Sequence, residues 1–333
     1  YTSASFDYAT NYSEDDLVRM ASDLTLEYLP GTRWNYSNTG YAMLGVMISR
    51  VTGVPYWEFL RERVFDSAGM PTIRINTATQ IVPHRARGYM PGPGGLQNAS
   101  HVAEQTNTTA DGSMLLSLRD MIAWNEAVRT RAVLSPESGD QIRSPMVLNS
   151  GNTHPYGFAW FFDEVAGQPV LEHSGSWQGF VNQSTRFPEQ DLSVIVLTNA
   201  RSAMSAPLAM RIGALIDPAL MPEPLPIEAI ADDPAVTTHV AGMLEKMSDG
   251  SLALTDFDFI RQTVFPRMRV ALQTQLAGLG RPDDLTLLAR EQVGDDTEFV
   301  YRATWGDRRM RVTLSIGPDG GLTNFVFIVP GTP

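Results

Sequence analysis

The sequence predicts an α+β protein of the α-β sandwich type, in which an antiparallel sheet flanked by helices is followed by a smaller α+β domain. Its 333 residues are about twice the usual domain size, which favours two domains. Residues 156–198 show strand patterns joined by short turns, with helical patterns on either side. Residues 218–234 contain five prolines, which is typical of a stiff linker. We therefore expect domains over 1–217 and 235–333.

The first domain begins with helices whose first turns can be recognised. Ser13 and Ser117 are each followed three residues later by an aspartate, Asp16 and Asp120, whose carboxylate can accept from the free amides of a first turn. Apolar residues recur at helical spacing after these and other turn signals. Helices are therefore expected over 12–22, 40–50 and 55–67, and from Ser117 and Pro136 onward.

Between these helices, residues 71–108 are rich in Gly, Pro, Asn and Thr, which predicts a long irregular loop region of the kind that often binds ligands. The sheet of the first domain is expected as an antiparallel meander over 156–163, 169–174, 179–187 and 192–198, followed by a helix over 203–216. The second domain is expected as helices over 236–247 and 256–277, then strands over 284–291, 297–305, 308–316 and 322–329.

Composition limits the classes of function. Hydrophobic residues make up 43% and charged residues 19%, which suits a folded protein with a core. The net charge of −12 disfavours nucleic acid as a partner, and no apolar run reaches the length of a membrane span. Without cysteine there are no disulfides and no thiolate chemistry, and the scattered histidines show no zinc-binding spacing. We expect no metal and no cofactor.

Two tripeptides carry the chemistry. Tyr36-Ser37-Asn38 lies between a turn and a helix, and His173-Ser174-Gly175 lies at the end of a predicted strand. Either tripeptide alone is a weak signal, but the order of the motifs around them is specific. That order includes Pro30-Gly31-Thr32, Gly40-Tyr41-Ala42-Met43-Leu44-Gly45, Tyr156-Gly157-Phe158-Ala159-Trp160 and Gly179-Phe180.

This ordered set resembles the family of class C β-lactamases, DD-carboxypeptidases, D-aminopeptidases and related esterases, over roughly residues 1–217. The resemblance implies a serine hydrolase that forms an acyl-enzyme with an amide or ester of a small molecule or peptide. The pairing of Tyr-Ser-Asn with His-x-Gly looks closest to the DD-peptidase and esterase branches, because β-lactamases of this class usually place lysine at the position of His173. The second domain resembles, more weakly, the small cystatin-like or lipocalin-like domains that follow many such hydrolases.

The resemblance also implies roles for individual residues. Tyr36 would take the proton of the nucleophile, with its pKa lowered by nearby cationic charge; the alternative is a half-buried tyrosine that bonds a loop. Asn38 would orient a lysine and the substrate amide, or else cap the following helix. His173 would border the cleft and polarise Tyr36 or protonate the leaving group, or else be structural. We expect Tyr36 and His173 to face each other across one groove.

The substrate-binding residues implied by the resemblance follow His173 directly. Ser174 would bind a substrate carboxylate or carbonyl, although a solvated strand hydroxyl is the alternative. Gly175 would allow the substrate to approach the backbone, and the amide of Ser176 would donate to the oxyanion.

The family also needs a Ser-x-x-Lys motif, and this sequence does not contain one, because its single lysine, Lys246, has Met243 three residues before it. We therefore expect a fold that is incomplete at its N-terminal side and inactive as it stands, with the nucleophile supplied by a separate segment or chain. The alternative is a non-catalytic relative that keeps the cleft as a binding module. The resemblance to bacterial hydrolases leads us to expect export from the cell. The substrate and the oligomeric state are left open by the sequence.

Overall fold

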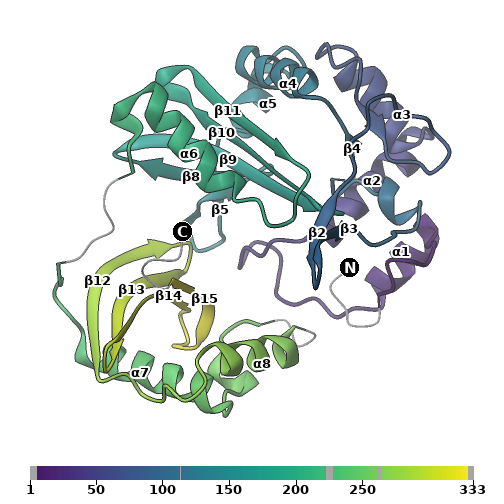
Figure 1. Ribbon diagram of the computed structural model, residues 1–333. Helices are drawn as coiled ribbons and strands as arrows, with labels where there is room; N and C mark the ends of the chain where they lie inside the picture. The colour runs from purple at the N-terminus through teal and green to yellow at the C-terminus, as the bar shows by residue number, and fades with distance from the viewer. Residues whose placement is uncertain (1–5, 113, 223–227, 261–263, 329–333) are drawn as a thin grey trace.

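A computed structural model describes residues 6–112, 114–222, 228–260 and 264–328. Parts of three predicted elements lie outside these ranges: residues 223–227 of the proline-rich stretch, 261–263 of a helix, and residue 329 of the last strand. Figure 1 shows helices and a sheet formed by the first two thirds of the chain above a second, smaller body formed by the last third.

The helices of the first domain form its first layer. They are α1 (Glu14–Ser22), α2 (Asn38–Thr52), α3 (Tyr56–Leu60), which continues as a π-helical turn over Arg61–Phe65, α4 (Leu118–Thr130) and α5 (Pro136–Gln141). Both predicted capping boxes are present, at Ser13 with Asp16 and at Ser117 with Asp120. The core of this layer includes Tyr56, Trp57 and Phe65, each less than 10% exposed.

The region 71–108 is more ordered than its composition predicts. It contains a hairpin of β2 (Tyr89–Gly92) and β3 (Gly95–Asn98) and a 3-10 turn over Thr106–Thr108, while β1 (Arg74–Ile75) pairs with β4 (Met114–Leu115). The amide of Tyr89 donates to the carbonyl of Asn199, at the end of the main sheet. A short pair, β5 (Met146–Val147) and β6 (Thr153–His154), follows the helical layer.

The main sheet forms the second layer. Its strands are β7 (Tyr156–Gly157), β8 (Trp160–Val165), β9 (Gln168–Trp177), β10 (Phe180–Phe187) and β11 (Leu192–Thr198), antiparallel in the order β11-β10-β9-β8-β7. Helix α6 (Ser205–Ile216) packs on one face, where Phe187, Ala209 and Leu220 are completely buried. Leu220 belongs to the 3-10 turn Pro218–Leu220, so the start of the proline-rich stretch packs into the core of the first domain.

The second domain packs helices against a four-stranded sheet. It comprises α7 (Pro234–Asp249), a 3-10 turn (Leu254–Asp256), α8 (Phe265–Gln275) and strands β12 (Asp284–Val293), β13 (Asp296–Trp305), β14 (Arg308–Ile316) and β15 (Leu322–Ile328), in sequential antiparallel order. The predicted helix over 256–277 was too long, because α8 begins only at Phe265. Before it, the Asp258 carboxylate accepts from the amides of Asp319 and Gly321, which fixes residue 258 in a loop.

The two domains contact each other at the turn between β12 and β13 and at Phe259, which precedes α8. The carboxylate of Asp295 accepts from Ser150 at 2.6 Å and Asn152 at 2.7 Å, and Asp296 forms an ion pair with Arg33 at 3.4 Å. The guanidinium of Arg33 also lies 5.4 Å from the ring centre of Phe259. Arg33 stands three residues before Tyr36, so the second domain contacts the segment that leads to Tyr36. None of the helices in the described ranges is long and apolar enough to cross a membrane.

Candidate active site

The first side chain of the site comes from the start of α2. Tyr36 lies two residues before the helix, and the Ser37 hydroxyl caps it by accepting from the amide of Gly40 at 3.0 Å. Ser37 therefore takes the capping role that we considered for Asn38, and that alternative for Asn38 is wrong. Asn38 is the first helical residue, its side chain is exposed, and it forms no hydrogen bond to the described residues.

The second side chain, His173, comes from β9, where it lies opposite Ser184 of β10. Its Nδ1 lies 2.6 Å from the carbonyl oxygen of Ser174, which can only accept, so Nδ1 carries the proton. Burial lowers the pKa of His173, while the bond to the Ser174 carbonyl acts in the opposite direction without cancelling the effect. The imidazole is therefore mainly neutral at pH 7, with Nε2 free to accept.

The two predicted residues lie on the same side of the molecule, as expected, but the rings of Tyr36 and His173 are directly beside each other, with centroids 6.0 Å apart, rather than on opposite sides of a groove. Tyr156 completes the group, because its hydroxyl lies 3.3 Å from Nε2 of His173 and its ring centroid 6.1 Å from that of Tyr36. Tyr41 lies near enough to Tyr156 to affect its pKa. The hydroxyl of Tyr156 and the imidazole of His173 can shift a proton between them without moving heavy atoms.

The pKa of Tyr36 does not change in the direction expected from the resemblance. Burial raises it, and the negative forms of Tyr41 and Asp111 raise it further. A lowered pKa would need a cation close to the phenol. The only lysine, Lys246, lies instead in α7 of the second domain and pairs with Asp256. Within the described residues, Tyr36 is therefore a neutral phenol at pH 7.

The predicted substrate-binding residues lie at the open end of β9. Ser174, Gly175 and Ser176 pair with β10 on one side, whereas the pairing with β8 stops at Glu172. All three residues are exposed, and a Cβ added at Gly175 would meet nothing within 4 Å. This strand edge can therefore accept an extended backbone or a carbonyl oxygen directly beside His173.

A hollow of about 920 Å³ opens beside these groups. Three tyrosines line it, namely Tyr36, Tyr41 and Tyr156. The apolar side chains of Leu44, Met146 and Phe158 line it as well. Trp34 also lines it, stacked on His154 with ring centroids 4.3 Å apart. The hollow is lined largely by aromatic and aliphatic side chains, which is usual for a small-molecule site.

Sequence reasoning missed Tyr41, Tyr156 and Trp34 as members of the site. Tyr41 and Tyr156 both belong to the ordered motifs described in the sequence analysis. Their place in the same set of motifs as Tyr36 and His173 was the sequence signal that could have identified them. Among the described residues, no three His, Asp or Glu side chains are grouped so as to hold a metal ion.

Comparisons with known proteins identify the family of the chain. The Beta-lactamase family profile matches residues 1–215, and the chain belongs to this family. A penicillin-binding protein of Bacillus subtilis is 28% identical over 203 residues, which cover 57% of this chain and 45% of that protein. D-aminopeptidase of Brucella canis is 29% identical over 209 residues, which cover 60% of this chain and 38% of that protein. The chain thus spans less than half the length of these relatives.

Solved structures show the same fold. A penicillin-binding protein from Bacillus halodurans is similar with a TM-score of 0.53, at 21% identity, over 61% of this chain and 62% of that one. The octameric penicillin-binding protein homologue from Pyrococcus abyssi is similar with a TM-score of 0.54, at 17% identity, over 96% of this chain and 69% of that one. The second similarity extends over both domains. The chain therefore has a β-lactamase-type fold, and its relatives include penicillin-binding proteins and D-aminopeptidases.

Proposed function

We propose that the full protein hydrolyses amides or esters of D-amino acids through an acyl-enzyme, with the cluster of Tyr36, Tyr156 and His173 as its proton-transfer group. The observation that carries this proposal is that Tyr36 and Tyr156 line a large apolar hollow and that His173 lies directly beside both of them. The names of the relatives, which include a D-aminopeptidase and a penicillin-binding protein, support the choice of substrate.

In this proposal the cluster moves one proton twice. In the first step a serine oxygen bonds to the substrate carbonyl carbon, and the hydroxyl proton passes to the cluster. In the second step the bond between the carbonyl carbon and the amine or alcohol breaks, and the cluster gives the same proton to this leaving group. The neutral Nε2 of His173 can accept this proton through the hydroxyl of Tyr156, which lies 3.3 Å from it. A water molecule repeats the sequence to release the acid. The amide of Ser176 and the open edge of β9 would hold the carbonyl oxygen.

We further propose that the serine and a lysine come from a Ser-x-x-Lys segment outside these 333 residues, because Lys246 cannot supply that motif. An apolar stripe on α2 supports this: Leu44, Met47 and Val51 lie at helical spacing and are 49%, 59% and 83% exposed. Leu44 also lines the hollow. A lysine beside Tyr36 would reverse the direction of its pKa shift. On this basis the 333 residues alone form no acyl-enzyme.

The test uses the longer gene product and the 333-residue chain in parallel. Hydrolysis of D-phenylalanine amide, its L-enantiomer and nitrocefin is followed for both. We expect the longer protein to prefer the D-amide and the shorter chain to hydrolyse none of the three. Turnover of nitrocefin but of neither amide would overturn the substrate assignment. A longer protein that has Gly or Ala in place of the serine, and binds D-phenylalanine amide without turnover, would establish the binding module instead.

A further inference from the structure

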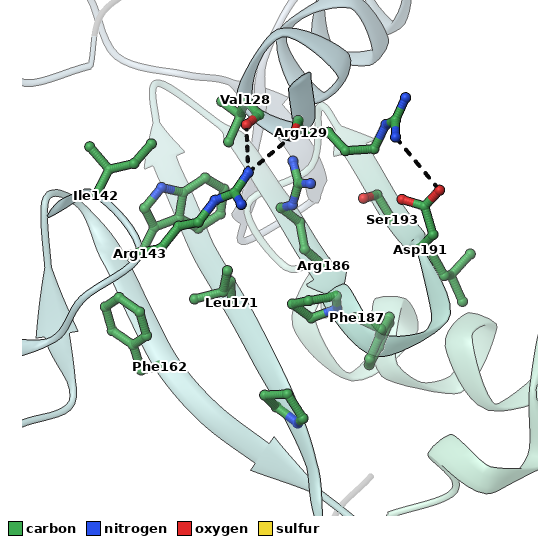
Figure 2. A pocket seen from close by; sticks show the side chains of 14 residues that line it. Val128, Arg129, Ile142, Arg143, Phe162, Leu171, Arg186, Phe187, Asp191 and Ser193 are labelled. Atoms are coloured by element: carbon green, nitrogen blue, oxygen red, sulfur yellow. Dashed lines mark hydrogen bonds and ion pairs between the residues drawn. The ribbon is translucent and has the colours of Figure 1, made fainter. Parts of the chain in front are cut away.

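A second hollow of about 340 Å³ lies elsewhere on the same domain and shares no lining residue with the one beside Tyr36. It is bounded by the end of α4, the segment after α5, and strands β8 to β11 (Figure 2). Three arginines, Arg129, Arg143 and Arg186, line it together with a single carboxylate, Asp191. This excess of positive charge stands out in a chain with 37 acidic and 25 basic residues.

Arg186 is the most deeply placed of the three, at 8% exposed. Its Nη1 donates to the backbone carbonyl of Asn125 at 3.0 Å and to the side-chain oxygen of Asn125 at 2.7 Å. Both acceptors are neutral, and within the described ranges no carboxylate lies within ion-pair distance of this guanidinium. Burial lowers the pKa of Arg186, and the nearby charge of Arg143 lowers it further, while the charges of Asp191 and Glu126, neither of which forms an ion pair with Arg186, act in the opposite direction without cancelling the effect. A buried cation without a bonded counter-charge is costly, so an anion at this place would be stabilising.

Arg143, like Arg186, donates to neutral acceptors. Its Nη2 donates to the carbonyls of Val128 at 2.9 Å and Arg129 at 3.2 Å, at the end of α4, and the described residues offer it no ion pair. Figure 2 shows the side chains of Arg143 and Arg186 extending into the same space. Two guanidinium groups held side by side, each with donors left over, form a site suited to a carboxylate.

Arg129 differs, although it lines the same hollow. Glu126 holds its guanidinium through two bonds of 2.7 Å, and Asp191 lies 3.9 Å away. In Figure 2 its side chain points toward Asp191 rather than toward the other two arginines. The charge of Arg129 is therefore already balanced, and this residue provides a matched control.

The wall of the hollow beside the arginines is apolar. Trp160, Phe162 and Leu171 project from adjacent strands onto the same face of the sheet as Arg186, because Phe162 and Arg186 both pair with Leu171 in the strand register. An anion bound here would thus carry an aromatic or aliphatic group that packs on this wall. The volume lies at the lower end of the range for small-molecule sites.

We propose that this hollow binds the carboxylate of a small apolar acid. Arg143 and Arg186 bind the carboxylate, and Trp160, Phe162 and Leu171 pack against the hydrocarbon part of the ligand. The same chemistry is presented by a free acid and by the last residue of a peptide with an apolar side chain. The site is independent of the proposed hydrolase function, since no residue is shared and no turnover is needed.

The test is a titration of the protein with 3-phenylpropionate, followed by calorimetry and by ligand-observed NMR. We expect saturable binding in the millimolar range, with 3-phenylpropanamide and acetate binding at least about tenfold more weakly, since the first lacks the charge and the second the apolar group. Arg143→Gln should weaken binding of 3-phenylpropionate about tenfold, while Arg129→Gln should leave it within about twofold. Circular dichroism checks that both variants are folded.

The source of the ligand is distinguished by comparing N-acetyl-phenylalanine with 3-phenylpropionate. Tighter binding of the former indicates a peptide C-terminus, and tighter binding of the latter a free acid; either result supports the proposal. Equal binding of the acid and its amide would overturn it without any mutation. So would equal losses in Arg143→Gln and Arg129→Gln, or the absence of saturable binding. None of these results bears on the cluster around Tyr36.

Discussion

The clearest stability prediction concerns Asp120, which is 0% exposed at the start of α4. One carboxylate oxygen accepts from the amide and the hydroxyl of Ser117, both at 2.8 Å, and from the hydroxyl of Thr72; the other accepts from the amide of Thr72 at 3.1 Å. In Asp120→Asn the new NH2 group must face at least one of these donors. A lost hydrogen bond to a charged group and an unsatisfied buried donor together predict a decrease of about 2–4 kcal/mol in the free energy of unfolding.

Urea unfolding followed by tryptophan fluorescence measures this loss, because Trp57 and Trp124 lie in the same core. The matched control is Asp16→Asn, which changes the corresponding capping residue of α1, where the side chain is 37% exposed. The control should lose much less stability. Equal losses in the two variants would refute the reasoning that burial and the bonds from Thr72 make Asp120 special.

The same prediction has a pH dependence with a definite sign. Burial raises the pKa of Asp120, but the hydrogen bonds from Thr72 and Ser117 outweigh it and hold the pKa below its usual value. Its stabilisation is therefore complete above the unfolded-state pKa of about 3.9 and is lost as the pH falls through the lower folded-state pKa. The difference between wild type and Asp120→Asn should accordingly shrink in acid. A difference that grows below pH of about 4 would contradict this assignment.

Three further predictions concern the site and its supports. In the protein that carries the Ser-x-x-Lys segment, Tyr36→Phe should lower kcat by about 10²–10⁴ with an unchanged unfolding midpoint, and unchanged turnover would remove Tyr36 from the mechanism. An NMR titration should give His173 a pKa below its ordinary value of about 6.5, because burial favours the neutral ring; a midpoint above it would contradict the neutral Nε2. A double-mutant cycle on Arg33 and Asp296, which are 19% and 23% exposed, should show a coupling of about 0.5–1 kcal/mol in urea unfolding, and zero coupling would mean that the ion pair does not join the domains.

The parts of the fold that follow from local chemistry were predictable. The capping boxes at Ser13 and Ser117 depend on residues three positions apart, and most strands of both sheets follow from alternation and turns. The prediction of one strand over 156–163 was wrong, because the chain turns at Phe158 and Ala159, which both have positive φ, and β7 and β8 pair with each other on either side of that turn. The partner of Asp120 was not predictable, because Thr72 is 48 residues away and meets it only through tertiary packing. The start of α8 was misplaced for a similar reason, since Asp258 is bound by a turn more than 60 residues later.

In the candidate site, too, some features were predictable from the sequence and others depend on tertiary structure. The proximity of Tyr36 and His173 was expected from the resemblance, and the structure brings the rings together. The part taken by Tyr156 depends on the direction of its side chain at the edge of the sheet, which the motif alone does not reveal. The capping of α2 by Ser37 rather than Asn38 is a choice between neighbouring residues that both favour the cap position, and the backbone direction decides it.

Intact-mass spectrometry after mixing the longer gene product with a p-nitrophenyl ester of D-phenylalanine tests the central claim most directly. We predict one acyl group per protein, located on the serine of a Ser-x-x-Lys segment, and slower acylation when Tyr36 is replaced by phenylalanine. An acyl group on any serine within the 333 residues, or acylation at the same rate without the Tyr36 hydroxyl, would contradict the account.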